Sequence, residues 1–402
     1  MAEEVRFVDT TLRDGVQSLW ASRLRTTEAV PALRDIDAAG FDGVELIAPA
    51  SAFSRGVKDL QEDPWELPRA VHARRPRSDF RLHGTMKPFL GRLPASVRGL
   101  ALERLASYGL RTTRAASSWN DVRAIARDKA MLDRLGIRYV ADLVFSISPR
   151  HTDDYYIERA RQLAEVKPWR VCLKDVGGLL DPVRASALVP RLVGTLGGIE
   201  LELHAHSTSG LAPVTVLAAV EAGVRVVHVS TPPLANGYAQ PSVFNVAANL
   251  RARGFEPAVD LEPLRRVSRH LGEVARIEHL AVGRPLEYDE RLFRHQVPGG
   301  MVTNLEFQLD QLGARDSLDA ALEEVGQVRI DLGYPIMITP LSQFVATQAV
   351  LNVVSGKRYE LVSDEVIQYA LGRWGEEAIA VMEPGVRGKI LDRQRARELS
   401  EV

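Results

Sequence analysis

Glu200-Leu201-Glu202-Leu203-His204-Ala205-His206 is a short run of alternating polar and apolar residues that ends in two histidines. Successive side chains of a β-strand point to opposite faces, so His204 and His206 share one face. The next residues, Ser207-Thr208-Ser209-Gly210, predict a turn, and a helix is expected from 213 to 222. Two imidazoles at the exit of a strand suit a divalent metal if an oxygen ligand arrives from elsewhere in the chain. The alternative interpretation is one histidine in the core and one capping the turn.

Composition places limits on the kind of protein. The chain has 402 residues, 46% of them hydrophobic and 26% charged, and a formal net charge of -1, which allows a large core and one large or two ordinary domains. This near-neutral balance gives no electrostatic footprint for nucleic acid. The single cysteine, Cys172, excludes an intrachain disulfide framework and fits a reducing cytosol. Because no apolar run reaches about 18 residues and the N-terminus lacks a signal-peptide pattern, we expect a cytoplasmic protein without a membrane partner.

Strand and helix patterns alternate along the first part of the chain. The expected strands are residues 5–9, 44–47, 80–83, 112–116, 139–145, 170–174, 200–206 and 224–229. The expected helices between them are residues 26–39, 64–74, 95–108, 120–135, 153–165, 182–193 and 213–222, and residues 10–15 are expected to be a polar turn. About eight strands alternating with helices over about 250 residues predict an α/β fold, a (β/α)8 TIM barrel. A doubly wound open sheet is the competing architecture, but no GxGxxG follows the first strand.

Four residues that could bind a metal follow or end the predicted strands. Asp14 comes after the first strand, Lys174 ends the sixth, and His204 and His206 end the seventh. In a TIM barrel these positions meet at one mouth, where the chemistry of such folds takes place. A lone aspartate after a strand usually caps a helix or forms a turn. Four such residues on one face favour a metal site instead.

After about residue 255 the pattern changes to helices without intervening strands. The candidates are residues 261–275, 305–312, 317–328, 342–354 and 363–371. Val297-Pro298-Gly299-Gly300 predicts a tight turn, and the charged residues 389–402 predict a solvated end. We therefore expect a catalytic barrel over residues 1–255 and a C-terminal helical region over residues 256–402 that packs on the barrel.

Several motifs resemble one enzyme family. They are Asp9-Thr-Thr-Leu-Arg-Asp-Gly-Val-Gln-Ser18, Lys174-Asp-Val-Gly-Gly-Leu-Leu180, His204-Ala-His-Ser-Thr-Ser-Gly-Leu-Ala-Pro213, Gln240-Pro-Ser242 and Gln296-Val-Pro-Gly-Gly-Met301. The chain resembles the carboxyltransferase domain of biotin-dependent enzymes such as pyruvate carboxylase, the oxaloacetate decarboxylase α subunit and the transcarboxylase large subunit. That family lies within a group of TIM-barrel metallolyases that also holds isopropylmalate synthase and hydroxymethylglutaryl-CoA lyase.

The resemblance implies a metal centre. Positions matching Asp14, Lys174, His204 and His206 bind a divalent metal in the family (Zn, Mn or Co), and the lysine is carbamylated. An ammonium cannot bind a cation, whereas a carbamate offers anionic oxygen. Without the carbamate, Lys174 would be a structural ion-pair partner, for example of Asp175.

The resemblance also implies catalytic residues. Arg13 and Gln17 match residues that hold the oxo acid and its enolate oxygen, and a cation beside a metal would stabilise that negative charge. The alternative for Arg13 is an ordinary surface charge.

Other positions depart from the family. The arginine and tyrosine that bind substrate and biotin fall on Thr85 and Arg92 by alignment, and the threonine that shuttles a proton to biotin falls on Tyr238. An aspartate of the fourth strand becomes Ser117, and a histidine becomes Val16.

Replacements for the lost groups can be named. Lys87 and Arg92 are expected to be cationic substrate-binding groups, and Tyr238 an acid or base, although all three could be surface groups. No Met-Lys-Met type biotin attachment site is present, so biotin, if used, must arrive on a separate carrier protein.

These observations predict a metal-dependent carboxyltransferase or decarboxylase. It would act on a small 2-oxo acid of the pyruvate or oxaloacetate type through an enolate, and the resemblance implies a homodimer. One alternative is a biotin-independent lyase, aldolase or condensing enzyme for another oxo acid. Another is a catalytically silent subunit of a carboxylase complex.

Overall fold

The computed structural model describes residues 2–49, 52–53, 56–86, 93–311 and 313–401. The chain forms two compact units: the first comprises Met1–Phe145 and Asp153–Tyr288, and the second comprises Ser146–Thr152 and Asp289–Val402. The boundary predicted between residues 255 and 256 falls inside the first unit. Among the residues described, no helix has the length and apolar character needed to cross a membrane.

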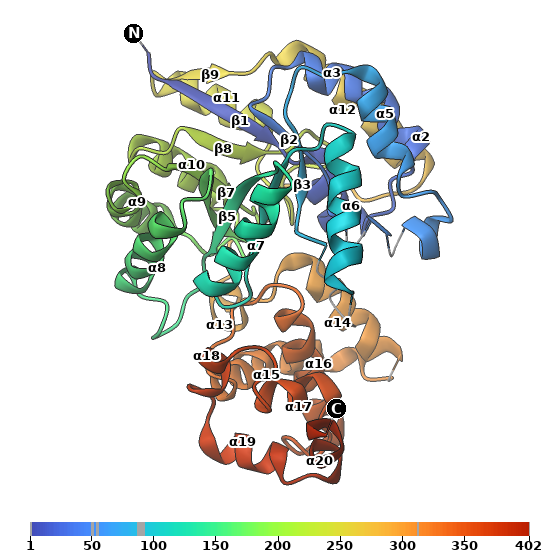
Figure 1. Cartoon of the computed structure of the whole chain (residues 1–402). Coiled ribbons are helices and arrows are strands. Elements are labelled where there is room, and N and C mark those ends of the chain that lie inside the picture. Colours follow the sequence, from blue (N-terminus) through green and yellow to red (C-terminus); the bar gives the residue numbers. More distant parts are fainter. Residues whose placement is uncertain (1, 50–51, 54–55, 87–92, 312, 402) are drawn as a thin grey trace. The chain divides into compact units, whose positions relative to one another are not determined.

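Eight parallel strands of the first unit form a closed barrel (Figure 1). Strands β2 to β8 pair in chain order, and β1 pairs with both β8 and β2, which closes the sheet. The strands are β1 (Glu4–Asp9), β2 (Gly43–Ile47), β3 (Phe80–His83), β4 (Thr112–Ala115), β5 (Arg138–Val144), β6 (Arg170–Asp175), β7 (Glu200–Ala205) and β8 (Val226–Val229). This arrangement confirms the predicted TIM barrel.

Helices follow the strands along the chain and surround the barrel (Figure 1). They are α2 (Thr26–Ala29), α3 (Leu33–Ala38), α5 (Glu66–Arg74), α6 (Ala95–Ser107), α7 (Val122–Arg134), α8 (Asp153–Val166), α9 (Pro182–Leu196), α10 (Ala212–Glu221), α11 (Val243–Ala252) and α12 (Leu261–Ile277). Helix α9 shows how the sequence sets these bounds. Asp181 caps its start by accepting a 2.8 Å hydrogen bond from the Arg184 amide, and Gly197 ends it at a φ of 59°.

The segment after β1 is helical, whereas the sequence predicted a polar turn. Thr11–Gly15 forms a single π-helical turn, η1, which continues directly into α1 (Val16–Trp20). The Gly15 amide donates a 3.0 Å hydrogen bond to the Thr10 carbonyl oxygen, which is the long-range bond of a π turn. Propensity does not predict this turn because its polar side chains are held by the barrel: the Thr10 hydroxyl lies 2.9 Å from the Val229 carbonyl oxygen.

Two elements between β8 and the second unit were not predicted. Helix α11 begins just after the Gln240-Pro-Ser242 motif, and the short strand β9 (Glu256–Ala258) pairs with the start of β1. The expectation of helices alone after residue 255 is therefore wrong at β9. Pro257 at its centre argues against a strand by propensity, but a proline is tolerated at the edge of a sheet.

The second unit is helical, as predicted. Its helices are α13 (Arg291–His295), α14 (Gly299–Gln311), α15 (Leu318–Asp331), α16 (Leu341–Ser355), α17 (Asp364–Ala370), α18 (Glu376–Ile379), α19 (Pro384–Leu391) and α20 (Gln394–Ser400). Helix α14 begins at Gly299, inside the predicted tight turn, and α19 and α20 occupy the predicted solvated end. Buried Asp331 binds the hydroxyl of Tyr359 at 2.8 Å and the guanidinium of Arg358 at 2.6 Å. The packing of this region on the barrel stays a prediction.

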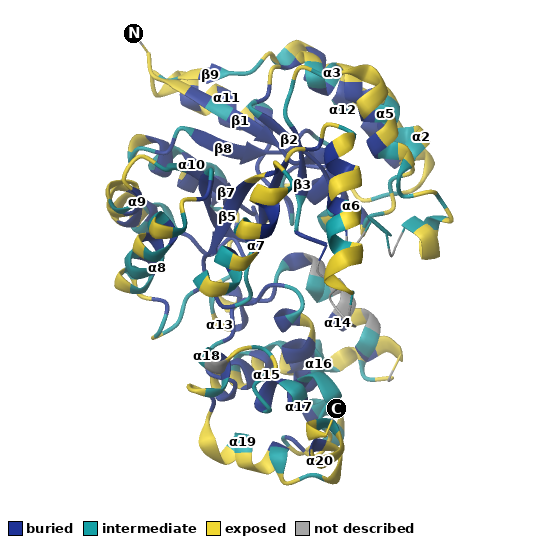
Figure 2. Ribbon diagram, viewed as in Figure 1, coloured by how far each residue is buried: buried dark blue, intermediate teal, exposed yellow. Residues whose placement is uncertain are grey.

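The buried strands of the first unit carry charged side chains as well as apolar ones (Figure 2). Glu45 on β2, Arg114 on β4, Asp142 on β5 and Glu202 on β7 have no exposed surface. The Arg114 guanidinium lies 2.6 Å from Glu45 and 2.9 Å from Asp142. Because barrel interiors are usually filled by branched apolar side chains, this charged core marks a specialised centre.

Candidate metal and substrate site

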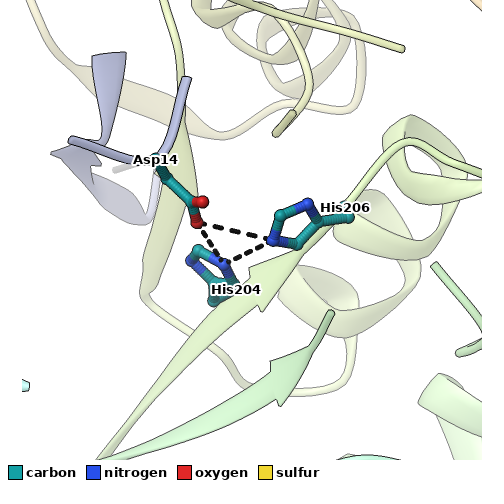
Figure 3. A group of neighbouring side chains, drawn as sticks. All are labelled: Asp14, His204 and His206. Atoms are coloured by element: carbon teal, nitrogen blue, oxygen red, sulfur yellow. Dashed lines mark hydrogen bonds and ion pairs between the residues drawn. The ribbon is translucent and has the colours of Figure 1, made fainter. Parts of the chain in front are cut away.

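Three metal-ligating side chains meet where β1 and β7 end (Figure 3). His204 lies in β7, His206 directly follows it, and Asp14 lies in η1 after β1. The Asp14 Oδ2 atom is 3.0 Å from Nε2 of His204 and 3.4 Å from Nε2 of His206, and the two Nε2 atoms are 3.1 Å apart. The structure thus brings together three of the four predicted metal ligands.

The spacing of these three atoms fits one divalent ion. Ligand atoms about 2.1 Å from an ion lie about 3.0 Å apart at neighbouring corners of an octahedron and about 3.4 Å apart in a tetrahedron. The observed separations run from 3.0 to 3.4 Å.

The protonation of the cluster also favours a cation. The Nδ1 atom of His206 lies 2.6 Å from the Tyr238 carbonyl oxygen, which can only accept, so His206 donates there and turns the lone pair of Nε2 toward Asp14. Burial opposes ionisation of Asp14, but Arg13 and the two histidines outweigh it and hold the pKa of Asp14 well below its ordinary value. Burial lowers the pKa of His204 well below its ordinary value. An ionised carboxylate therefore faces imidazoles that are not positively charged, which is the donor set of a metal site.

Lys174, the fourth predicted ligand, ends in the barrel core near this cluster. Its Nζ atom lies 3.2 Å from Oδ2 of Asp142 and 3.3 Å from Nε2 of His83. The suggested pairing with Asp175 is wrong, because the Asp175 carboxylate accepts the backbone amides of Leu179 and Leu180 at 2.9 and 2.8 Å. Burial is the main cause that lowers the pKa of Lys174, although Asp142 opposes it.

Arg13 is part of the core and not a surface charge. Its residue is 5% exposed, its Nε atom lies 2.8 Å from Glu45, and its Nη2 atom binds both Glu45 and Asp14. Among the described residues, Nη1 of Arg13 has no hydrogen-bond partner. The carboxylate of Glu45 therefore fixes the guanidinium and leaves one edge free for a ligand.

Gln17 lies one helical turn beyond Arg13 and is exposed. Both residues line a cavity of about 100 Å³. The remainder of the wall includes Leu12, Val16, Leu24, Ala29, Leu46 and Ile47. The polar ends of Arg13 and Gln17 thus meet an apolar space beside the metal ligands.

The other predicted site residues have different fates. Tyr238 is half-buried, and its backbone carbonyl, rather than a feature visible in the sequence, binds the ring of His206. Thr85 is buried with 3% of its surface exposed, and Ser117 is half-buried. Lys87 and Arg92 lie outside the described residues.

Several residues of the site were not predicted. His83, Glu45 and Asp142 surround Arg13 and Lys174, and Gln240 places its side-chain nitrogen 3.2 Å from Oδ2 of Asp14. Burial, followed by the charges of Arg13 and Lys174, lowers the pKa of His83 well below its ordinary value. A signal was available for His83, because it is the last residue of β3, and for Glu45 and Asp142, which are lone acids in apolar strands.

A second group of potential ligands lies deeper in the barrel. Atoms of Cys172, Glu202 and His228 approach one another within 4.8 Å, and all three residues are buried. Burial opposes ionisation of Glu202, but Arg81 and His228 outweigh it and lower its pKa below the ordinary value. This deeper group adjoins His204, whose Nδ1 atom is 3.0 Å from Nδ1 of His228.

Comparisons with known families cover nearly the whole chain. Residues 4–271 match the family model described as HMGL-like. Residues 292–401 match the family model described as a conserved carboxylase domain, PYC_OADA.

Individual proteins are similar over the same length. The chain is 34% identical over 392 residues to a pyruvate carboxylase subunit from Methanocaldococcus jannaschii, which covers 96% of this chain and 68% of that protein. It is 32% identical over 375 residues to the methylmalonyl-CoA carboxyltransferase 5S subunit from Propionibacterium freudenreichii, which covers 92% of this chain and 74% of that one. The fold matches the carboxyl transferase domain of Rhizobium etli pyruvate carboxylase, solved with pyruvate and biocytin, with a TM-score of 0.90 at 24% identity over 98% of this chain and 69% of that chain.

Proposed function

The chain belongs to the HMGL-like family and carries the conserved carboxylase domain, and on that premise we propose that it is a metal-dependent carboxyltransferase or decarboxylase for a small 2-oxo acid. The relatives named for pyruvate carboxylase and for methylmalonyl-CoA carboxyltransferase support a substrate of the pyruvate or oxaloacetate type. The observation that carries the proposal is the cluster of Asp14, His204 and His206 beside the fixed guanidinium of Arg13.

The residues of the site divide the work between them. Asp14, His204 and His206 would hold a divalent metal, which when bound supplies a Lewis acid for the oxo oxygen of the substrate. The free edge of Arg13 would bind the same end of the acid and stabilise the negative charge that develops as carbon dioxide leaves or as a proton is taken from the neighbouring carbon. Gln17 would orient the acid from the cavity side.

Lys174 would complete the metal site as a carbamate. Its neutral amine attacks the carbon of carbon dioxide, a nitrogen–carbon bond forms, and a proton is released. Burial supports this step because it lowers the pKa of Lys174 and so favours the neutral amine that must react. The resulting anionic oxygen is a ligand that the ammonium cannot offer.

Biotin would come from another protein. The two relatives are named as subunits, which supports a separate carrier as a partner of this chain. Tyr238 would exchange a proton with biotin or substrate, and Lys87 and Arg92 would bind the anionic groups. A homodimer and a cytoplasmic location stay predictions.

The experiment is turnover of oxaloacetate by the purified chain with its metal content measured in parallel. Assays with and without free biotin would include Tyr238→Thr and Tyr238→Phe, with Tyr288→Phe as the matched control because Tyr288 is 59% exposed. Biotin-stimulated loss of oxaloacetate by metal-loaded protein is the expected result, and Tyr238→Phe should reduce it. A chain that binds no divalent metal and turns over no 2-oxo acid would refute the proposal.

A second function is favoured by Thr85, Ser117 and Tyr238, which differ from the residues expected at these positions in a biotin-using member of the family. The chain would then be a biotin-independent lyase, aldolase or condensing enzyme that keeps the same metal site. Metal-dependent turnover that is unaffected by biotin would select this function. The intact ligand cluster argues against a catalytically silent subunit, which has no need of it.

A further inference from the structure

Three buried side chains form a line that ends at the candidate metal site. Nδ1 of His204 lies 3.0 Å from Nδ1 of His228, and Nε2 of His228 lies 3.0 Å from Oε2 of Glu202. None of the three residues has exposed surface. Glu202 and His204 share strand β7, and His228 lies on its neighbour β8, so the backbone fixes all three positions.

The carboxylate sets the direction of the protons along this line. Oε1 of Glu202 accepts from Arg81 at 3.0 Å and from Arg170 at 2.9 Å, which keeps the group ionised. An ionised carboxylate can only accept, so Nε2 of His228 carries the proton that points to Oε2. A neutral imidazole has one N–H group, and Nδ1 of His228 is then an acceptor.

The consequence reaches the metal ligand. Nδ1 of His204 must donate to the acceptor on His228, and Nε2 of His204 is left with a lone pair that points at Asp14. This is the tautomer in which Nε2 can bind a metal. The opposite tautomer would place a proton where the ion belongs.

One neighbour favours the opposite tautomer. Nη2 of Arg114 lies 3.4 Å from Nδ1 of His204, where it could donate if that nitrogen were bare. This distance exceeds the usual range for such a bond, and the other nitrogens of Arg114 are paired with Glu45 at 2.6 Å and Asp142 at 2.9 Å. The 3.0 Å contact with His228 is shorter and therefore decides the tautomer.

Gln240 gives independent support. Its side-chain nitrogen lies 3.0 Å from Nε2 of His204 and 3.2 Å from Oδ2 of Asp14. Its oxygen lies 2.8 Å from the Thr10 hydroxyl, which fits an amide whose NH₂ group faces the ligands. An amide donor fits an Nε2 atom that carries a lone pair.

The same line excludes a second metal site at Cys172, Glu202 and His228. Both oxygens of Glu202 are already occupied by Arg81, Arg170 and His228. The thiol of Cys172 faces Arg114 at 4.0 Å, and a cation placed there would meet those guanidinium groups.

We propose that Glu202 and His228 are positioning residues that hold His204 in the tautomer required for metal binding. The proposal rests on the metal site of the proposed function but assigns two residues outside the ligand set. A carboxylate behind a metal-binding histidine typically changes metal affinity about 10-fold to 100-fold. Here that effect would pass through a second imidazole.

The first test measures the affinity and stoichiometry of Zn²⁺ for the full chain by competition with a chromophoric chelator. His228→Leu and Glu202→Gln should weaken binding about 10-fold to 100-fold, and His228→Asn, which keeps an acceptor near the lost Nδ1, should restore part of it. Cys172→Ser is the matched control from the same buried group and should bind like the parent chain. Parent-like affinity in His228→Leu and Glu202→Gln would overturn the proposal, as would two ions per chain with one lost in Cys172→Ser.

The second test reads the tautomer directly and does not depend on variants that fold poorly. Long-range ¹⁵N–¹H spectra of histidine-labelled parent chain should show His204 protonated at Nδ1, with the signal assigned by its loss in His204→Gln. A proton on Nε2 of His204 would refute the proposal even if the chain binds metal. The right tautomer in a chain that binds no Zn²⁺ would instead refute the proposed metal site and leave the assignment of the tautomer in place.

Discussion

Arg13 is the residue on which charge stabilisation at this site depends. Its guanidinium is held on one side by Glu45 and Asp14, and its other edge has no partner among the described residues. Arginine offers a planar fork that lysine lacks, so a lysine cannot hold both the carboxylates and a substrate. The position of Arg13 therefore matters more than its charge alone.

We expect Arg13→Lys to lower kcat/KM for the oxo acid by about 100-fold or more, because a preorganised donor at a developing negative charge is worth about that much. Steady-state kinetics on protein of known metal content would measure it. Arg23→Lys is the matched control, because Arg23 is exposed on the same segment of the chain. An unchanged kcat/KM in Arg13→Lys would show that the guanidinium does not contact the reacting acid.

Asp9 is a residue whose ionisation should affect folding. Burial raises the pKa of Asp9 from 3.8 to about 7, although the amide and hydroxyl of Thr11 oppose the shift. The folded chain therefore keeps a proton between about pH 4 and pH 7 that the unfolded chain has lost. Stability should fall as the pH rises through this window, by on the order of 4 kcal/mol in total.

Asp9→Asn should remove this part of the pH dependence, because an amide does not titrate. Urea unfolding from pH 4 to pH 8 would compare the free energies of unfolding of the two chains. If both lose stability equally over that range, Asp9 is ionised in the folded state and the assigned pKa is wrong.

The ligand residues were predictable one by one, but their partners were not. Asp14, His204 and His206 stand at strand ends, where the (β/α)8 pattern and the family resemblance both point. The partner of Lys174 is Asp142, 32 positions earlier in the chain, and no local pattern identifies it. A neighbour in sequence such as Asp175 points away along the same strand and instead binds backbone amides.

At the scale of elements, η1 determines where Asp14 lies. Its π turn packs against the loop after β8, and a Cβ atom built on Gly15 would lie 2.6 Å from the Leu234 carbonyl oxygen. A backbone atom cannot move aside easily, so the turn requires glycine at this position.

Gly15→Ala should destabilise the chain by about 1–3 kcal/mol and weaken metal binding, because Asp14 would shift with the turn. Gly99→Ala in α6 is the matched control: nothing lies within 4 Å of its added Cβ, and alanine favours a helix interior. Thermal unfolding and Zn²⁺ titration would compare both with the parent chain. Equal behaviour of the two variants would mean that η1 adapts to a side chain at residue 15.

The strands were predicted well because parallel, fully buried strands read as short apolar runs between turn signals. The elements that the sequence did not predict owe their shape to distant contacts. The π turn of η1 is held by β8 and the loop after it, and β9 exists only because Glu4 and Arg6 of β1 pair with residues 256 and 258.

At the scale of the whole molecule, the chain combines a predictable barrel with an unpredictable charged interior. The eightfold repeat gives the barrel, since each unit buries its strand against the next. The ion pairs of the interior join residues far apart in sequence: Arg81 meets Glu202 across 121 positions, and Arg114 meets Glu45 across 69. Buried ion pairs of this kind contribute little net stability, so we infer that they are kept to fix the site.

The division of the chain gives a final prediction. Residues 256–288 lie in the first compact unit, whereas composition placed the domain boundary before them. In α12, Leu264, Val267 and Leu271 are at most 1% exposed, and the Trp20 indole donates a 2.7 Å hydrogen bond to the carbonyl oxygen of Ala281.

A fragment of residues 1–288 should therefore fold and bind Zn²⁺, whereas residues 1–255 should not. The shorter fragment exposes the apolar side chains that α12 covers, and the three residues Leu264, Val267 and Leu271 alone bury about 1.5–3 kcal/mol each. Circular dichroism, thermal unfolding and Zn²⁺ titration of both fragments would test this. Cooperative unfolding of 1–255 at the temperature of 1–288 would place the boundary where the sequence pattern put it. Failure of both fragments would mean that the first unit needs residues 289–402 to fold.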